Sequence, residues 1–459
     1  MHRHAHPLSS DTFRAGRNTL PIASLEQQFQ WCEFTSAPVG FEMINNWIRQ
    51  CVESHESCRQ KLNSMKPTRL LDLFAFTDSD DVRLVHAEEV EVEEYATLSY
   101  RWGGCNALTL TLNNYDGLRM RVQFRALPKT IQEAVQVCRA LRVKHFWVDA
   151  LCIIQEGGDD FANEVSNMGA IYAGFLFTIA AADATDSESG FFNARHPLHR
   201  EDCVLVGSDN IHWIFGHDYD SCRHHDVWLG GTALSKRAWV FQERMMSPRT
   251  IHFTSNEIIF ECREQIVCHG CAQSGLSTKA DPVTAWYEGK SAFSTLHQDW
   301  DEKEQLLRFR VVWDQVVHDY SHAKLTNIDD RLSALAGIAQ LAEIKFQYHA
   351  SYGLWLECFI DELQWRSGNG NAETCDRIPS WSWVSRAREG VLQHNYEKQI
   401  TSDRELLSAT ITSFPPITSF TRLSALYTQS PLSASFKIRG RIKTFRTVPV
   451  SDELPMVIS

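Results

Sequence analysis

The sequence lacks the patterns that would place it in a specialised structural class. It has no internal repeat, no low-complexity segment and no excess of positive charge, since 45 lysines and arginines stand against 57 aspartates and glutamates. A phosphate backbone requires a basic footprint, so the formal net charge of -12 argues against nucleic-acid binding. Hydrophobic residues make up 43% of the 459 residues, which is enough apolar surface for a globular core.

Membrane and export signals are also missing. The longest uncharged apolar run, Met168 to Ala182, is shorter than the ~20 residues that a membrane helix needs, and it contains Gly169 and Gly174. We predict a buried segment there and no membrane span. The first residues, Met1 to Pro7, lack the apolar stretch of a secretory signal. With 13 scattered cysteines, this predicts reduced thiols and a cytoplasmic location.

Motifs of several common enzyme classes are absent as well. The sequence has no G-x-G-x-x-G after a strand and no G-x-x-x-x-G-K-[ST], which argues against a standard dinucleotide or P-loop site. It has no G-x-S-x-G and no H-E-x-x-H, which argues against a serine hydrolase of the elbow type and a zinc protease.

Hydrophobic spacing predicts an alternation of strands and helices in the first half of the chain. Thr130 and Glu133 have the spacing of a capping box at the start of one of these helices. The alternating elements are a strand at Tyr95–Tyr100, a helix over about 129–141, a strand at His145–Asp149, a helix at Asp160–Tyr172 and a strand at Phe175–Ala181. This order predicts an α/β fold with a parallel sheet flanked by helices.

The remaining segments suggest a division of the chain. Further expected elements are a helix at Phe41–Cys58, strands at Arg69–Phe74, Val82–His86 and Leu108–Leu112, a helix at Leu234–Met246, a hairpin at Thr250–Cys262 and helices over 301–345. We expect a disordered tail over 1–40, a helical extension over 41–92, an α/β domain over 93–262, an insertion or linker over 263–300, and a helical and mixed α+β region over 301–459.

Two segments follow the carboxyl ends of predicted parallel strands, where open α/β sheets bind ligands. The first contains Ser99, Tyr100, Arg101, Trp102 and Gly103, which combine a stacking face, a fixed positive charge and a close backbone approach. A tight turn with a packed tryptophan would leave the same pattern.

The second segment begins with Asp149 and contains Gln155. A carboxylate that closes an apolar strand is costly unless it is paired or in use, so Asp149 is a candidate catalytic residue. It could instead cap the next turn or pair with an arginine. Cys152, between apolar neighbours, is interpreted as a core residue.

A third segment lies on the helix predicted over Leu234–Met246. Trp239, Gln242 and Glu243 would share a helix face with Ser235, and Arg237 lies nearby. Glu243 could act as a general base or could hold an arginine in a salt bridge.

Metal-ligating residues occur, although we assign none of them to a metal. Cys51, His55 and Cys58 occupy one helix face, but zinc usually takes four ligands. Side chains that could complete or form a second set are Cys262, Cys268, His269 and Cys271. A packed helix face would explain the first three equally well, so zinc binding at Cys51, His55 and Cys58 is left open.

Several of these segments together resemble the fungal heterokaryon incompatibility (HET) domain. Its opening motif resembles Tyr95-Ala-Thr-Leu-Ser-Tyr-Arg-Trp-Gly103. Later blocks resemble Leu127–Ala134, Phe146–Gln155, Met168–Tyr172 and Arg237–Glu243. Flanking pieces also fit proteins that carry this domain, namely Trp47–Cys58, Asp330–Gly337, Tyr352–Trp355 and Pro379–Trp383. The motifs occur in the right order over about 45–385.

The resemblance implies a TIR-like α/β core and a role in non-self recognition, with programmed cell death as the output. It implies self-association and contact with other incompatibility proteins. Because related TIR domains include NAD hydrolases that use a helical glutamate, NAD is a possible substrate, and Glu133, Glu164 and Glu243 are the possible glutamates. Alternatives are an NAD nucleosidase gated by self-assembly and an enzyme of secondary metabolism with a deep pocket lined by some of the 14 tryptophans.

Overall fold

The computed structural model describes the chain in segments. Full description extends over residues 35–36, 38–59, 66–104, 107–194, 229, 231–255, 257–268, 290, 293, 301, 304–325, 330–359, 361–363, 365 and 382–385. For the remaining short strands and the ends of a few elements, it describes the backbone alone.

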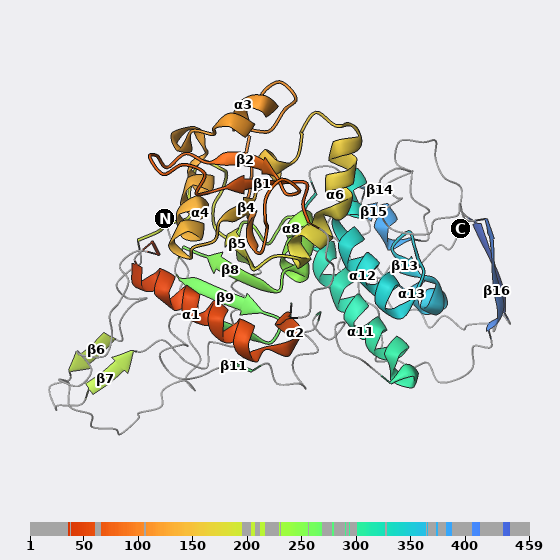
Figure 1. The fold of residues 1–459 in the computed structure, drawn as a ribbon. Coiled ribbons are helices and arrows are strands. Elements are labelled where there is room, and N and C mark those ends of the chain that lie inside the picture. Colours follow the sequence, from red (N-terminus) through yellow and green to blue (C-terminus); the bar gives the residue numbers. More distant parts are fainter. Residues whose placement is uncertain are drawn as a thin grey trace.

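A nine-stranded mixed sheet forms the centre of the molecule (Figure 1). Its order is β11-β10-β9-β8-β5-β3-β4-β1-β2, and the four central strands β8, β5, β3 and β4 are parallel to their neighbours in this group. The strands are β1 (Arg69–Asp72), β2 (Arg83–His86), β3 (Tyr95–Ser99), β4 (His145–Trp147), β5 (Phe177–Ala181), β8 (Arg249–Phe253), β9 (Ile258–Cys262), β10 (Gln265–Cys268) and β11 (Thr278–Lys279).

This arrangement confirms the predicted α/β class and its parallel centre. All residues of β3, β4 and β5 are buried, as expected for strands covered by helices on both faces. Antiparallel strands extend both sides of the parallel group, with β1 and β2 beside β4 and the predicted 250–262 hairpin formed by β8 and β9.

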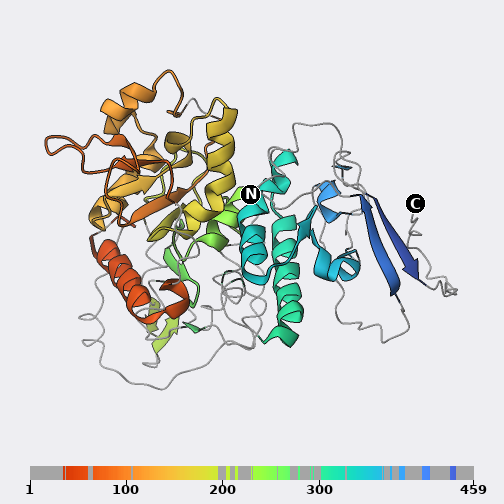
Figure 2. The same ribbon diagram turned by 45° about the vertical axis from the view of Figure 1, so that its right-hand side comes forward.

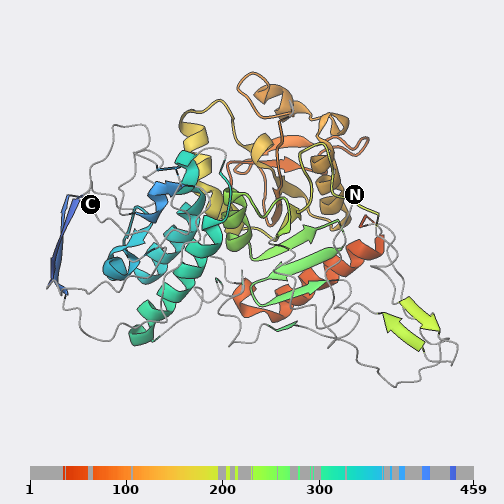
Figure 3. The same cartoon turned by 180° about the vertical axis from the view of Figure 1, so that it is seen from behind.

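Helices lie against both faces of the sheet. The helices of this part of the chain are α1 (Pro38–Ser54), α2 (Glu56–Arg59), α3 (Tyr115–Met120), the 3-10 turn η2 (Phe124–Ala126), α4 (Lys129–Ala140), α5 (Asp149–Cys152), α6 (Gly158–Ala173) and α8 (Ala238–Met246). Helix α1 packs against β9 and α4, and Figure 3 shows it along the β8–β9 hairpin. Helix α4 also packs on β3, whereas α6 and α8 pack against each other.

A helical region packs on the α6–α8 side of the sheet (Figure 2). Its elements are α11 (Glu302–Ser321), η7 (Ile328–Arg331), η8 (Ser333–Leu335), α12 (Ala336–Phe346), β12 (Ala350–Ser351), β13 (Leu354–Trp355), η9 (Leu356–Cys358), α13 (Phe359–Glu362) and η10 (Trp383–Ser385). The two regions share one hydrophobic core. At the contact, a Cβ added to Gly169 of α6 would lie 2.5 Å from Cα of Gly337, so only glycine allows the two backbones to approach this closely.

Further short strands form separate two-stranded sheets. These are β6 (Cys203–Val206) with β7 (His212–Phe215), β14 (Glu373–Thr374) with β15 (Arg386–Ala387), and β16 (Leu406–Ser413) with β17 (Ser435–Gly440). The predicted tail over 1–40 and linker over 263–300 fall largely outside the described residues, as do His269 and Cys271. Within the described part, no helix combines the length and the apolar character that crossing a membrane requires.

Several local predictions were wrong. The single helix expected over Phe41–Cys58 is interrupted at His55, so Cys51 and Cys58 lie on two helices, α1 and α2. Residues 108–111 form no strand, because their backbone bonds to the short helix α5 and the turn after it: Leu110 N–H donates to the carbonyl of Ala150, and the Leu110 carbonyl accepts from Gln155 N–H. The predicted capping box is also absent, since helix α4 begins after Pro128 without a side-chain cap. Instead, Thr130 and Glu133 bind the backbone of the loop around 186–192.

Candidate functional site

The carboxyl ends of β3 and β4 bring together residues that sequence alone placed in separate motifs. Ser99 ends β3 and Tyr100 follows it, while Asp149 begins the short helix α5 directly after β4. Glu243, from helix α8, reaches the same point, where its carboxylate accepts a hydrogen bond from the Ser99 hydroxyl. Ser99, Tyr100 and Glu243 are buried, and Asp149 is partly exposed, so the group has a buried base and a side nearer solvent.

Asp149 is held in place by three neighbouring groups. Its Oδ2 accepts a hydrogen bond of 2.8 Å from the Trp102 indole N–H, and its Oδ1 accepts one of 2.7 Å from Ala150 N–H. The Tyr100 hydroxyl also bonds to this carboxylate. Burial raises the pKa of Asp149 to about 6, although these bonds and the charge of Arg237 act in the opposite direction.

The environment of Glu243 raises its pKa as that of Asp149 does. The pKa of Glu243 is raised to about 7, by burial first and also by the nearby charge of Asp149, although the hydrogen bond from Ser99 and the charge of Arg237 act in the opposite direction. Two neighbouring acids whose pKa values are raised toward neutrality are a common arrangement in active sites.

Arg237 lies close to both carboxylates and bonds to the segment after β3. Its guanidinium donates a hydrogen bond of 2.7 Å to the Tyr100 carbonyl, and its charge acts on both acids. The following loop is tightly packed at Gly103, which has φ of +75° and where a Cβ would lie 2.5 Å from Cβ of Asp186. Glycine is therefore required there for both conformation and space.

The predicted ligand-binding residues of the third segment separate in the structure. Helix α8 begins at Ala238, four residues later than expected, so Ser235 lies in the preceding turn and shares no helix face with the others. Gln242 accepts a hydrogen bond of 2.6 Å from Gly337 N–H, and Trp239 donates to Asp330. Both side chains thus contact the helical region, while Glu243 contacts the sheet.

The other predicted positions have more varied surroundings. Gln155 donates hydrogen bonds to the carbonyls of Asp149 and Ile153, which positions the turn that carries Asp149. Arg101 is partly exposed beside Trp102. Cys152 is fully buried, which confirms its interpretation as a core residue.

Two features of this region were missed by sequence reasoning. Tyr172 of α6 lies next to Glu243 and donates a hydrogen bond of 2.9 Å to the Leu98 carbonyl. In the sequence, Tyr172 has only the pattern of a residue on the apolar face of a helix. The one other signal is that it ends the segment Met168–Tyr172, which resembles a HET motif. Burial raises the pKa of Tyr172 well above its usual range, so it is a neutral hydrogen-bond donor there.

The second missed feature is a buried ionic cluster on the neighbouring strands. Glu261 of β9 is fully buried, and its carboxylate binds Arg244 at 2.6 Å and His252 at 2.9 Å. The charges of Arg244 and Lys290 hold the pKa of Glu261 well below its usual range despite burial. Strand residues at hairpin spacing carry no sequence signal for such a pairing.

A small cavity lies between Ser99, at the end of β3, and the ionic cluster of Glu261, Arg244 and His252. Its volume is about 20 Å³, which is room for about one water molecule. The lining includes side chains of the β3, β5 and β8 strands, of the segment before α8 and of α8 itself, among them Ser99, Thr178, Ser235, Arg244 and His252. A nucleotide would therefore have to bind on the outer side, where Trp102, Asp149 and Arg237 are partly exposed.

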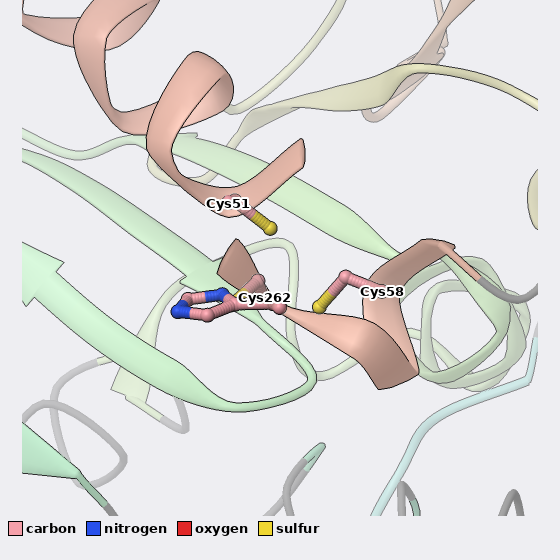
Figure 4. Close-up of side chains that lie close together, drawn as sticks. Cys51, Cys58 and Cys262 are labelled. Carbon is pink, nitrogen blue, oxygen red and sulfur yellow. The ribbon is translucent and has the colours of Figure 1, made fainter. Parts of the chain in front are cut away.

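Four side chains able to bind a metal gather away from this site. They are Cys51, His55, Cys58 and Cys262, and Figure 4 shows the three cysteines at the meeting point of α1, α2 and β9.

Comparison with known proteins identifies a family match that covers the parallel strands β3, β4 and β5 and the residues at the ends of β3 and β4. A family model described as "Heterokaryon incompatibility protein (HET)" matches residues 95–243, which begin at β3 and end at Glu243. The chain matches neither a curated protein nor a solved structure in the comparisons made. The matched segment contains Ser99, Asp149 and Arg237 together with Glu243. Residues 95–243 of this chain therefore form a heterokaryon incompatibility domain.

Proposed function

We propose that this protein acts in fungal heterokaryon incompatibility, where its HET domain signals cell death after non-self recognition. The family match over 95–243 carries this proposal. The parallel centre of the sheet, with helices on both faces, supports a TIR-like module that works through assembly with further copies or with other incompatibility proteins.

We further propose that the residues gathered at the carboxyl ends of β3 and β4, namely Ser99, Tyr100, Asp149 and Glu243, form a site that cleaves NAD. The observation that favours this activity is the meeting of Asp149 and Glu243 at one edge of the sheet, both with pKa values raised toward neutrality. Carboxylates placed beside a cationic sugar centre stabilise the charge that develops when a glycosidic bond breaks.

The surroundings of the three possible glutamates distinguish among them. Glu133 accepts hydrogen bonds from the backbone of Phe191 and Phe192, so it supports a loop. Glu164 lies on α6, where Arg69 and Asp160 act on its carboxylate. Glu243 is on a helix, contacts Ser99 and lies close to the second carboxylate, which makes it our choice for the catalytic glutamate.

The proposed reaction breaks the bond between the nicotinamide nitrogen and C1′ of the ribose. Nicotinamide leaves as a neutral molecule because its ring nitrogen takes the bonding electron pair, so the leaving group needs no proton. The carboxylates of Asp149 and Glu243 stabilise the positive charge on the ribose, one of them accepts a proton from water, and the oxygen of that water bonds to C1′. The products are nicotinamide, ADP-ribose and a proton.

Substrate binding would use the partly exposed side of the site. Trp102 offers an aromatic face for the nicotinamide or adenine ring, and Arg101 and Arg237 offer charges for the pyrophosphate. The exposure of these side chains supports gating by self-assembly, because a second copy packed over the loop would shield the bound nucleotide from bulk solvent and leave room for the attacking water.

The test is release of nicotinamide from NAD by the purified full-length chain, first dilute and then concentrated. We expect release that rises more steeply than protein concentration, and its loss in Glu243→Gln and Asp149→Asn. Glu164→Gln is the matched control, since it makes the same chemical change at another buried carboxyl group. No release by the wild-type chain at any concentration, or full activity in both site variants, would refute the NAD proposal.

Induced expression in fungal cells separates the two proposals. If cell death depends on NAD cleavage, the wild-type chain and Glu164→Gln will kill the cells and Glu243→Gln will not. If Glu243→Gln kills the cells as well as the wild-type chain does, cell-death signalling does not depend on NAD cleavage. Survival of cells that express the wild-type chain at every level, alone and after fusion with strains of different incompatibility type, would refute the signalling proposal.

The secondary-metabolism alternative receives less support from the structure. The tryptophans at 147, 313, 355 and 383 are fully buried in the shared core, so they pack the interior and do not line an open pocket.

A further inference from the structure

A four-residue cluster joins the two segments that flank the HET domain. Cys51 lies on α1, Cys58 on α2 and Cys262 at the end of β9, with His55 between the two helices. One ligand atom from each of the four lies within 4.8 Å of all the others. In Figure 4 the Cys51 and Cys58 side chains point into a common space beside Cys262.

The spacing of the donor atoms suits a tetrahedral ion. Zinc bonds of about 2.3 Å to sulfur and about 2.0 Å to nitrogen place two sulfurs about 3.8 Å apart, and a sulfur and a nitrogen about 3.5 Å apart. Cys262 Sγ lies 3.3 Å from His55 Nδ1, close to the second of these separations. Three thiols and one imidazole are also a common donor set of structural zinc sites, which are closed by four protein ligands.

Two buried arginines lie beside the cluster. Arg249 is buried, and its Nε donates a hydrogen bond of 3.1 Å to Cys51 Sγ. Arg263 is also buried, and its charge acts on Cys58 and Cys262. Zinc with three thiolates carries one net negative charge, which these two guanidiniums would compensate.

Hydrogen bonds outside the donor set hold its parts in place. The backbone N–H of Glu264 donates to Cys262 Sγ at 3.4 Å, a contact that stabilises a thiolate and orients it. The Glu264 carboxylate accepts hydrogen bonds from Ser57 N–H at 3.0 Å and from the Ser57 hydroxyl at 2.6 Å. Arg263 donates to the Ser57 carbonyl at 2.6 Å, so α2 is fixed against the β9–β10 turn.

We propose that Cys51, His55, Cys58 and Cys262 bind one zinc ion that joins the N-terminal helices to the sheet beyond the HET domain. His55 and Cys262 lie 207 positions apart in the chain, and the matched residues 95–243 lie between them. A link across so long a segment removes much conformational freedom from the unfolded chain, so its main effect is on stability.

The metal content of the full-length chain, purified under reducing conditions without added chelator, tests the site directly. We expect about one zinc ion per chain, and replacement by cobalt(II) should give the visible absorption of a tetrahedral thiolate complex. Removal of the metal with a strong chelator should lower the melting temperature by roughly 5–10 °C, and added zinc should restore it. Cys58→Ser and Cys262→Ser should lose the metal.

Cys138→Ala is the matched control, because Cys138 of α4 is a fully buried free thiol outside the cluster and its loss should leave one zinc per chain. A folded wild-type chain with less than about one-tenth of a zinc ion, and no uptake of cobalt(II), would overturn the proposal. Retention of the metal in both serine variants would also overturn it. So would a disulfide between two of the three cysteines in the protein purified under reducing conditions. These readouts do not use enzyme activity, so they stand apart from the NAD proposal.

Discussion

The raised pKa of Glu243 predicts that removing its charge stabilises the protein. The folded pKa of about 7 compared with the ordinary value of 4.5 corresponds to roughly 3 kcal/mol of unfavourable free energy once the carboxylate is ionised. Because the folded state binds its proton more tightly than the unfolded state does, this group's contribution to stability is fully present below pH 4.5. It is lost as the pH rises toward 7.

Glu243→Gln keeps the shape of the side chain and its contact with Ser99 but cannot ionise. We therefore expect the variant and the wild type to have similar free energies of unfolding at pH 4.5. At pH 8 the variant should be more stable, by up to about 3 kcal/mol, since the wild type then holds a buried charge beside Asp149. Urea denaturation at several pH values measures the difference.

The same substitution at an exposed position is the control. Glu304 on α11 forms an exposed pair with Arg308, and Glu304→Gln should change stability by less than ~1 kcal/mol. A stability gap between Glu243→Gln and the wild type that does not grow between pH 4.5 and pH 8 would refute the argument. So would a variant that is less stable than the wild type at pH 8.

Three further predictions concern packing and the site. Gly169→Ala should destabilise the protein by about 1–3 kcal/mol in thermal or urea unfolding, because its Cβ would meet the Gly337 backbone, and an unchanged stability would contradict that contact. Gly117→Ala, in helix α3 with open space around it, should instead stabilise by about 0.4–1 kcal/mol; a loss of stability would show that the space is filled. Trp102→Phe removes the N–H that lowers the Asp149 pKa, so the acid limb of the pH profile for nicotinamide release should move to higher pH, and an unmoved limb would exclude this role.

The sequence was sufficient for the elements whose signal is local. The apolar strands at Tyr95, His145 and Phe175 and the helices between them follow from side-chain periodicity, and their order predicted the parallel centre of the sheet. Asp149 became a candidate because its carboxylate closes an apolar strand, and Glu243 because it shares a predicted helix face with Trp239 and Gln242. The HET motifs were recognisable because each is a short stretch of sequence and they occur in the right order.

Other features depended on contacts between residues far apart in the chain. Thr130 and Glu133 have the spacing of a helix cap, yet the loop at 186–192 competes for both side chains and binds them. Gln242 and Glu243 are neighbours in the sequence, but the helical twist turns the first toward Gly337 and the second toward Ser99.

The candidate zinc site shows the same limit. Cys51, His55 and Cys58 form a pattern that the sequence displays, but three ligands leave zinc undecided. Only the folding of the β8–β9 hairpin against α1 and α2 brings Cys262 to them as the fourth. The sequence by itself determined which segments form the sheet and which side chains can do chemistry. The tertiary structure decided which of those side chains meet. Packing and long-range hydrogen bonds favour some contacts over others that the local sequence cannot distinguish.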